Sequence, residues 1–173
     1  MSGHAGTLVR RLAAARIGET FNQYAQSRRL RDRLACYLAD RSGATILLVG
    51  EAAGYRGARV SGIPFTSERQ LTGAGPAEGS ATIVHRTLTE LGIADDVLLW
   101  NVVPTHPGTP TTNRLPTRAE IDAGVPFARE LARNRRVIAV GRVAERVLDA
   151  PYVRHPSHGG AAAFRETLRA CLI

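Results

Sequence analysis

Two short polar segments, far apart in the chain, carry the side chains whose types could do chemistry. The first, Gly50-Glu51-Ala52-Ala53-Gly54-Tyr55, directly follows the apolar run Ile46–Val49. The second is His155-Pro156-Ser157-His158-Gly159-Gly160, close to the end of the chain. Both stand where a buried strand is expected to end, and the carboxyl ends of strands are where ligands bind in open parallel sheets. Two such ends facing one crevice would hold a ligand between a carboxylate and an imidazole.

Four side chains in or near these segments are candidates for binding or catalysis. Glu51 offers a carboxylate in a tight turn at a strand end, although a capping or salt-bridge role also explains it. Asn101 lies inside an apolar strand, so its amide must hydrogen-bond either to a loop or to a ligand. Phe65, among glycine and proline, either anchors its loop or stacks on a flat heterocycle. His155 is held in extended geometry by the following proline, and we expect it to be functional.

Several other chemistries find little support in the sequence. GEAAGYRG lacks both the GK[ST] ending of a phosphate loop and the GxGxxG of a dinucleotide site. His106, His155 and His158 could meet at one crevice, but their spacing is irregular for a metal site. Cys36 and Cys171 show no CxxC spacing and are expected to be reduced thiols of a cytosolic protein. We therefore expect neither a metal nor an organic cofactor.

The charge of the chain favours a polyanionic partner. Its 23 basic residues, all arginine, outnumber 15 acidic ones, for a net charge of +8. Guanidinium groups bind phosphate oxygens in pairs, so nucleic acid is the simplest partner. Codon bias would explain the absence of lysine but not the excess of positive charge.

Length and hydropathy favour one globular domain over residues 1–173. Apolar residues make up 44% of the chain, enough for a core, and no apolar run is long enough to span a membrane. The polar, glycine-rich segment Met1–Thr7 does not have the pattern of a secretory signal. We expect a cytoplasmic monomer.

Alternating apolar runs and helical patterns predict the architecture. Strands are expected at Thr45–Val49, Asp96–Val103, Arg136–Val140 and Tyr152–Arg154. Helices are expected at Leu8–Ala15, Phe21–Ala39, Pro76–Gly92, Gly141–Leu148 and Ala161–Leu172, with a further helix that begins at Thr117 and has a capping box. Long loops are expected at Gly54–Gly79 and Pro104–Pro116. This order predicts an α/β fold, a three-layer α/β/α sandwich with a central four-stranded parallel sheet.

Taken together, the motifs resemble those of the uracil-DNA glycosylase superfamily, nearest in pattern to the bacterial family 4 enzymes. The resemblance runs from about Thr45 to Arg165. In chain order, the segments that carry it are GEAAG, GIPFTSE, WNVVPTHPG followed by NRLPTRAEI, VIAVG, and RHPSHGG.

The resemblance implies an enzyme that flips uracil out of DNA and hydrolyses its N-glycosidic bond, which initiates base excision repair. It implies that Glu51 positions or activates the attacking water and that His155 donates to uracil O2, as the two catalytic residues. Phe65 would stack on the base and Asn101 would read its Watson–Crick edge. The remaining expected substrate-binding residues are Gly50, Ala52, Gly54 and Tyr55, and the expected DNA-binding residues are Ser157, His158 and Arg165.

Three departures from the family patterns matter. The chain has two cysteines and so does not have the four that hold the iron–sulfur cluster of family 4. Ala52 stands where family 1 has a catalytic aspartate, so the role of base falls to Glu51 or to no side chain. His158-Gly159-Gly160 replaces the leucine wedge of family 1, which leaves His158 or Arg165 to fill the gap of a flipped base. Tyr55 is a candidate for excluding the 5-methyl group of thymine.

Three other interpretations stay open at this point. The same scaffold could act on another base, such as hypoxanthine, xanthine or mismatched thymine. It could also be a nucleic-acid-binding module without catalysis. The third alternative is a metal-dependent α/β enzyme that handles phosphates or nucleotides.

Overall fold

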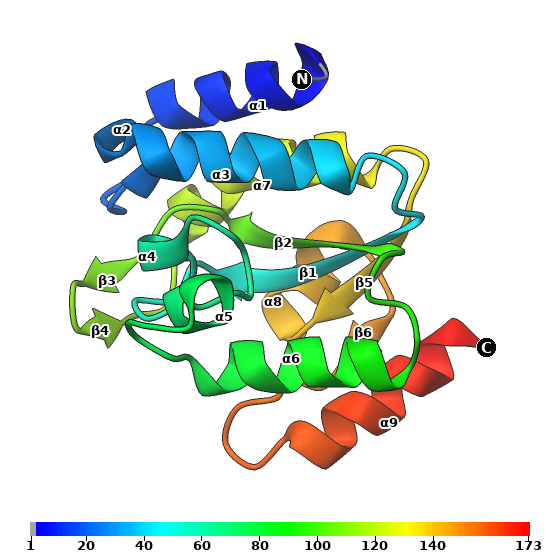
Figure 1. Cartoon of the computed structure of the whole chain (residues 1–173). Helices are drawn as coiled ribbons and strands as arrows, with labels where there is room; N and C mark the ends of the chain where they lie inside the picture. Colours follow the sequence, from blue (N-terminus) through cyan, green and yellow to red (C-terminus); the bar gives the residue numbers. More distant parts are fainter. Residues whose placement is uncertain (1–2) are drawn as a thin grey trace.

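A computed structural model describes residues 3–173, and it shows a central sheet between layers of helices (Figure 1). The sheet has four strands in the order β2-β1-β5-β6, and every pairing is parallel. These strands are β1 (Ile46–Ala52), β2 (Val97–Val103), β5 (Arg136–Val140) and β6 (Tyr152–Val153). The predicted three-layer α/β/α fold with a four-stranded parallel sheet is confirmed.

Each face of the sheet has its own apolar core. Leu47 and Val49 of β1 pack with α1 (Gly3–Ala14), α3 (Arg28–Asp40), α7 (Arg118–Ala132) and α8 (Arg142–Leu148). Leu48, between them in sequence, packs on the opposite face with α6 (Gly79–Glu90) and α9 (Ala161–Leu172). Figure 1 shows α6 and α9 on the side of the sheet away from α1 and α3. Side chains of a strand alternate between faces, so an apolar run such as ILLV fits a strand that is covered on both.

The edge of the sheet at β2 is covered by α3. The Tyr37 hydroxyl of this helix lies 2.7 Å from the Leu99 amide nitrogen and accepts its hydrogen bond. All seven residues of β2 are buried. The side chain of Tyr37 thus satisfies a donor that an edge strand would otherwise leave unpaired.

The helix expected over Phe21–Ala39 is two helices, α2 (Gln23–Gln26) and α3. Ser27 separates them in an extended conformation, and its side chain accepts a hydrogen bond from the Leu30 amide. Asn22 caps α2 in the same way. Both residues offer side-chain acceptors that compete with helical hydrogen bonds, and the periodic apolar pattern does not show this.

The two long loops contain short elements that sequence reasoning missed. The segment 54–79 includes α4 (Ala58–Ser61) and α5 (Glu68–Thr72), and 104–116 includes a hairpin of β3 (Gly108–Thr109) and β4 (Thr112–Asn113). The capping box at the start of α7 is confirmed: Thr117 and Glu120 each accept a hydrogen bond from the other's amide. Among residues 3–173, no helix is long and apolar enough to cross a membrane.

Candidate active site

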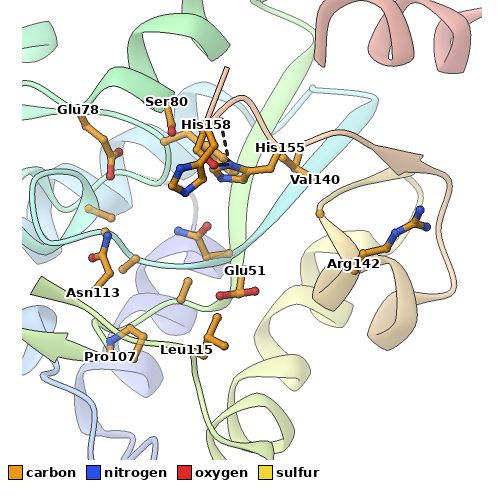
Figure 2. Close-up of a pocket in the computed structure, with 18 of the residues that line it drawn as sticks. Glu51, Glu78, Ser80, Pro107, Asn113, Leu115, Val140, Arg142, His155 and His158 are labelled. Atoms are coloured by element: carbon orange, nitrogen blue, oxygen red, sulfur yellow. Dashed lines mark hydrogen bonds between the residues drawn. The ribbon is translucent and has the colours of Figure 1, made fainter. Parts of the chain in front are cut away.

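The carboxyl ends of the four parallel strands surround one cavity of about 500 Å³ (Figure 2). This volume lies within the range of about 300–1,000 Å³ typical of small-molecule sites. Glu51, Phe65, Asn101 and His155 all line the cavity, although they come from four distant parts of the chain. The structure therefore brings together the four side chains that the sequence singled out.

Phe65 reaches the cavity because Gly50 has no side chain. Gly50 pairs with Asn101 across β1 and β2, and the Phe65 ring lies against it. A Cβ atom on Gly50 would stand 2.9 Å from both Phe65 Cε2 and Asn101 Oδ1, and closer still to Phe65 Cζ. Because Gly50 has no side chain, the Phe65 ring packs directly on β1 beside the Asn101 amide.

The loop that carries Phe65 is fixed by buried hydrogen bonds. Phe65 has a φ of 52°, a left-handed conformation that costs a residue with a side chain on the order of 1–3 kcal/mol. The Ser61 hydroxyl donates to the Thr66 carbonyl over 2.6 Å, and the Tyr24 hydroxyl donates to the Gly62 carbonyl over 3.0 Å. The Thr66 hydroxyl also lies 2.9 Å from His85 Nε2. These contacts hold the ring in place. Gly62 and Thr66 belong to the GIPFTSE segment, but sequence reasoning did not identify Tyr24, Ser61 or His85, whose side chains make these contacts.

The side-chain amide of Asn101 faces the cavity without a protein partner among residues 3–173. It is 4% exposed, yet in the described part of the chain no hydrogen bond links its amide to a loop or to another side chain. A buried amide normally has partners, so its donor and acceptor are available to a molecule in the cavity.

The hydrogen bonds of His155 define which of its nitrogens can donate. The Ser157 amide N–H donates to His155 Nδ1 over 3.1 Å, and the Ser157 hydroxyl lies 2.7 Å from the same atom. An amide can only donate, so Nδ1 accepts and a neutral ring carries its proton on Nε2. Burial lowers the pKa of His155 below its ordinary value of 6.5, with further lowering by Arg154 and His158. His155 is therefore held as a neutral imidazole with an Nε2–H donor.

Glu51 stands near the end of β1, with its carboxylate at the cavity (Figure 2). The sheet pairing continues through Ala52 and Val103, so this residue lies in a strand rather than in the expected tight turn. Burial raises the pKa of Glu51 above its ordinary value of 4.5. Within residues 3–173 its carboxylate makes no ion pair and no hydrogen bond, so it is free to accept a proton from water.

The other expected site residues divide into two groups. Ala52, Gly54, Ser157 and His158 line the cavity. Tyr55 instead lines an adjoining hollow, where its ring lies under the Arg56 guanidinium at 5.2 Å. Arg165, on α9, does not line the cavity and pairs with Glu90 at 3.2 Å.

Several lining residues were not singled out from the sequence. Glu78 and Ser80 lie at the start of α6, and Asn113, Arg114 and Leu115 are at the end of the hairpin and just after it, within the NRLPTRAEI segment to which no role was assigned. Arg114 is anchored by Glu120, a buried carboxylate that also accepts hydrogen bonds from the amides of Thr117 and Glu19. The capping box was visible in the sequence, but the ion pair with Arg114 was not.

His106 connects two of the segments that surround the cavity. It is fully buried, and its Nδ1 lies 2.7 Å from the Ala53 carbonyl, so it ties the loop after β2 to the end of β1. Its Nε2 is occupied by the Thr109 carbonyl at 2.8 Å. No cluster of three or more histidine, cysteine, aspartate or glutamate side chains suited to a metal is found in residues 3–173.

Comparisons with known proteins agree with this geometry. The sequence model of the Uracil DNA glycosylase superfamily matches residues 37–169, which include every cavity-lining candidate named above. A search of curated proteins found no match. Among solved structures, wild-type SMUG2 of Pedobacter heparinus has a similar fold, with a TM-score of 0.68, 13% sequence identity, and coverage of 97% of this chain and 96% of that one. The chain belongs to the uracil DNA glycosylase superfamily.

Proposed function

We propose that this protein removes uracil from DNA by hydrolysing the bond between the base and its sugar, the first step of base excision repair. Membership of the superfamily supports a DNA glycosylase, and the cavity supports the choice of base. One observation carries the proposal: an aromatic ring, an unpaired amide, a neutral imidazole donor and a free carboxylate line a single cavity.

His155 would stabilise the leaving base. Cleavage of the C1′–N1 bond leaves electrons on the uracil ring, which departs as an anion with charge on O2. The Nε2–H of His155 is preorganised to donate to that oxygen, because Ser157 already occupies the other ring nitrogen. Loss of one such donor in enzymes that stabilise an oxyanion typically costs about 2.7–4 kcal/mol.

Glu51 would act on the sugar side. The sugar becomes positively charged as the bond breaks, and a nearby carboxylate stabilises that charge. Water then adds to C1′ and gives its proton to Glu51, whose raised pKa makes it a better acceptor.

Asn101 and Phe65 would select and hold the flipped base. Uracil presents an N–H and a keto oxygen to an amide, whereas cytosine offers the opposite pattern and leaves buried polar groups unpaired unless the amide turns over. Stacking on Phe65 contributes roughly 1–3 kcal/mol, which offsets part of the cost of taking the base out of the helix.

DNA that contains uracil is the proposed partner, with the protein acting as a monomer in the cytoplasm. The net charge of +8 is the electrostatic basis for this choice. Affinity should fall with salt, log K decreasing by about 0.7–0.9 per phosphate neutralised for each tenfold rise in salt.

Incubation with an oligonucleotide that contains one uracil, followed by alkaline cleavage, tests the proposal. We expect cleavage at the uracil and none at the same position in thymine or cytosine controls. Replacement of His155 by alanine should lower the single-turnover rate by about two to three orders of magnitude, from the donor cost above. Parallel substrates with hypoxanthine, xanthine or a G:T mismatch define the range of bases. Binding without release of any base would contradict the proposal and indicate a non-catalytic module.

A further inference from the structure

Glu78 is a second carboxyl group in the cavity, and the mechanism above does not use it. It immediately precedes α6 in an extended conformation, with φ −119° and ψ 123°, and its side chain does not cap that helix. It lines the cavity instead, which it reaches from a different element than Glu51 and His155 (Figure 2).

Two glycines of GEAAGYRG form the space that its carboxyl group occupies. A Cβ atom on Gly57 would stand 2.9 Å from Glu78 Cδ and 3.0 Å from its Oε1. A Cβ atom on Gly54 would stand 3.3 Å from Glu78 Cδ and closer still to Oε1. The backbone after β1 is therefore shaped to receive this side chain, although the two segments lie far apart in the sequence.

The carboxyl group has no protein partner in the part of the chain that the structure describes. It makes neither an ion pair nor a hydrogen bond there, and burial raises its pKa above 4.5. A half-buried carboxyl group without a partner is costly to desolvate, and groups with shifted pKa values concentrate at functional sites. The absence of a partner, together with the cavity at its tip, indicates that a ligand supplies one.

We propose that Glu78 is a specificity-determining residue that takes up a proton when the base binds and donates a hydrogen bond to the 4-keto oxygen of the flipped uracil. This rests on the proposed function. In the proposed complex, His155 donates to O2, and Asn101 hydrogen-bonds N3–H and one lone pair of O4. The second lone pair of O4 is then the polar position left for another contact. Tyr55, the residue expected to face this edge, instead has its ring against Arg56 in the adjoining hollow. Glu78 stands over Gly54 in its place.

Two variants separate hydrogen bonding from space filling. Glu78→Gln keeps a donor and an acceptor in nearly the same shape, whereas Glu78→Met keeps the approximate length and removes both. Both variants remove the negative charge that Glu78 carries before the base binds, which by itself strengthens DNA binding. Glu166→Met, at an exposed position on α9, is the matched control for that charge.

Binding to two oligonucleotides gives a readout that does not need catalysis. One carries 2′-fluoroarabino-uridine, which resists cleavage, and the other carries a tetrahydrofuran residue with no base at the same position. Relative to Glu166→Met, we expect Glu78→Met to bind the uridine strand about tenfold more weakly, the effect of losing one net hydrogen bond. Its affinity for the tetrahydrofuran strand should not change, and Glu78→Gln should keep both affinities within about threefold of the control.

Equal affinities of Glu78→Met and its control for both strands would overturn the inference. Equal weakening on both strands would also overturn it, because Glu78 would then only support the loop. The proposed function is tested separately by release of uracil from the wild-type protein's cleavable substrate. If that release fails, the binding comparison still decides whether Glu78 contacts the base.

Discussion

Replacement of Gly50 by alanine gives the sharpest test of the site, because the substitution acts on two binding residues at once. The added methyl carbon would lie 2.9 Å from Phe65 Cε2 and from Asn101 Oδ1. Real Cβ atoms essentially never approach other heavy atoms more closely than 3.0 Å, so both side chains must shift, Phe65 the more because its Cζ would be closer still. Both are largely buried, with Phe65 8% exposed and Asn101 4% exposed, so the cavity that they line is the space into which they can move.

The expected loss of activity follows from the proposed role of the Phe65 ring, which is to stack on the base. The backbone of Phe65 cannot retreat easily, because the whole segment from Ser61 to Ser67 is buried. We therefore expect the ring to tilt off the base and to lose about 1–3 kcal/mol of stacking. At about 1.4 kcal/mol per tenfold change, kcat/KM for uracil release should fall by roughly 10- to 100-fold. Overpacking should also lower the free energy of unfolding by about 1–3 kcal/mol.

Steady-state cleavage of a single-uracil oligonucleotide and denaturant unfolding measure the two effects. Gly43→Ala is the matched control, because a Cβ atom there meets nothing within 4 Å. Phe65→Leu in the Gly50→Ala background should relieve the crowding and recover stability without recovering activity, since leucine cannot stack on a base. A Gly50→Ala protein with unchanged kcat/KM would refute the placement of Phe65 on the strand beside Asn101.

Three further predictions concern hydrogen bonds and charges of the site. Ser157→Ala removes the hydroxyl from His155 Nδ1 but keeps the amide donor, so single-turnover release of uracil should fall by only about three- to tenfold. The carboxylate of Glu51 is the proposed base and its pKa is raised, so activity should decline as pH falls through a value above 4.5, and Glu51→Gln should abolish this acid limb of the pH–rate profile. Arg114, together with the amides of Thr117 and Glu19, holds the pKa of Glu120 at about 2 rather than 4.5. This stabilises the fold by at most about 3 kcal/mol above pH 4.5, because solvent screens the partly exposed Arg114, and the stabilisation is lost as pH falls toward 2. Arg114→Met should therefore lower the free energy of unfolding at pH 7 by up to about 3 kcal/mol and reduce its decline toward pH 2, as measured by denaturant unfolding.

The strands could be predicted because their signal is local. A continuous apolar run such as that of β1 needs burial on both faces, and the alternation with helices then implies a parallel sheet. The end of β1 was not predicted, because Gly50, Glu51 and Ala52 do not resemble a strand. They continue the strand only because β2 offers partners as far as Val103.

The chemistry at the strand ends was predictable for a related reason. Parallel strands bring their carboxyl ends to one edge, so Glu51, Asn101 and His155 meet once the topology is fixed. Glu78 and Arg114 reach the same cavity from loops, and their positions depend on contacts with distant segments. No local pattern in the sequence records those contacts.

The glycines of GEAAGYRG have a structural role that the sequence pattern alone does not reveal. In a phosphate loop, glycines allow left-handed backbone angles and exposed amides. Gly50, Gly54 and Gly57 are absent from the positive-φ glycines of residues 3–173, although Gly57, with φ −102° and ψ −120°, lies outside the regions that residues with a side chain favour. Each instead makes room for a side chain from another loop: Phe65 over Gly50, and Glu78 over Gly54 and Gly57. The spacing of these glycines therefore reflects where two cavity-lining side chains pack on the end of β1 and the loop that follows it. A substitution at Gly50 or Gly54 should act through Phe65 or Glu78 rather than through the conformation of the loop itself, whereas one at Gly57 should act through both.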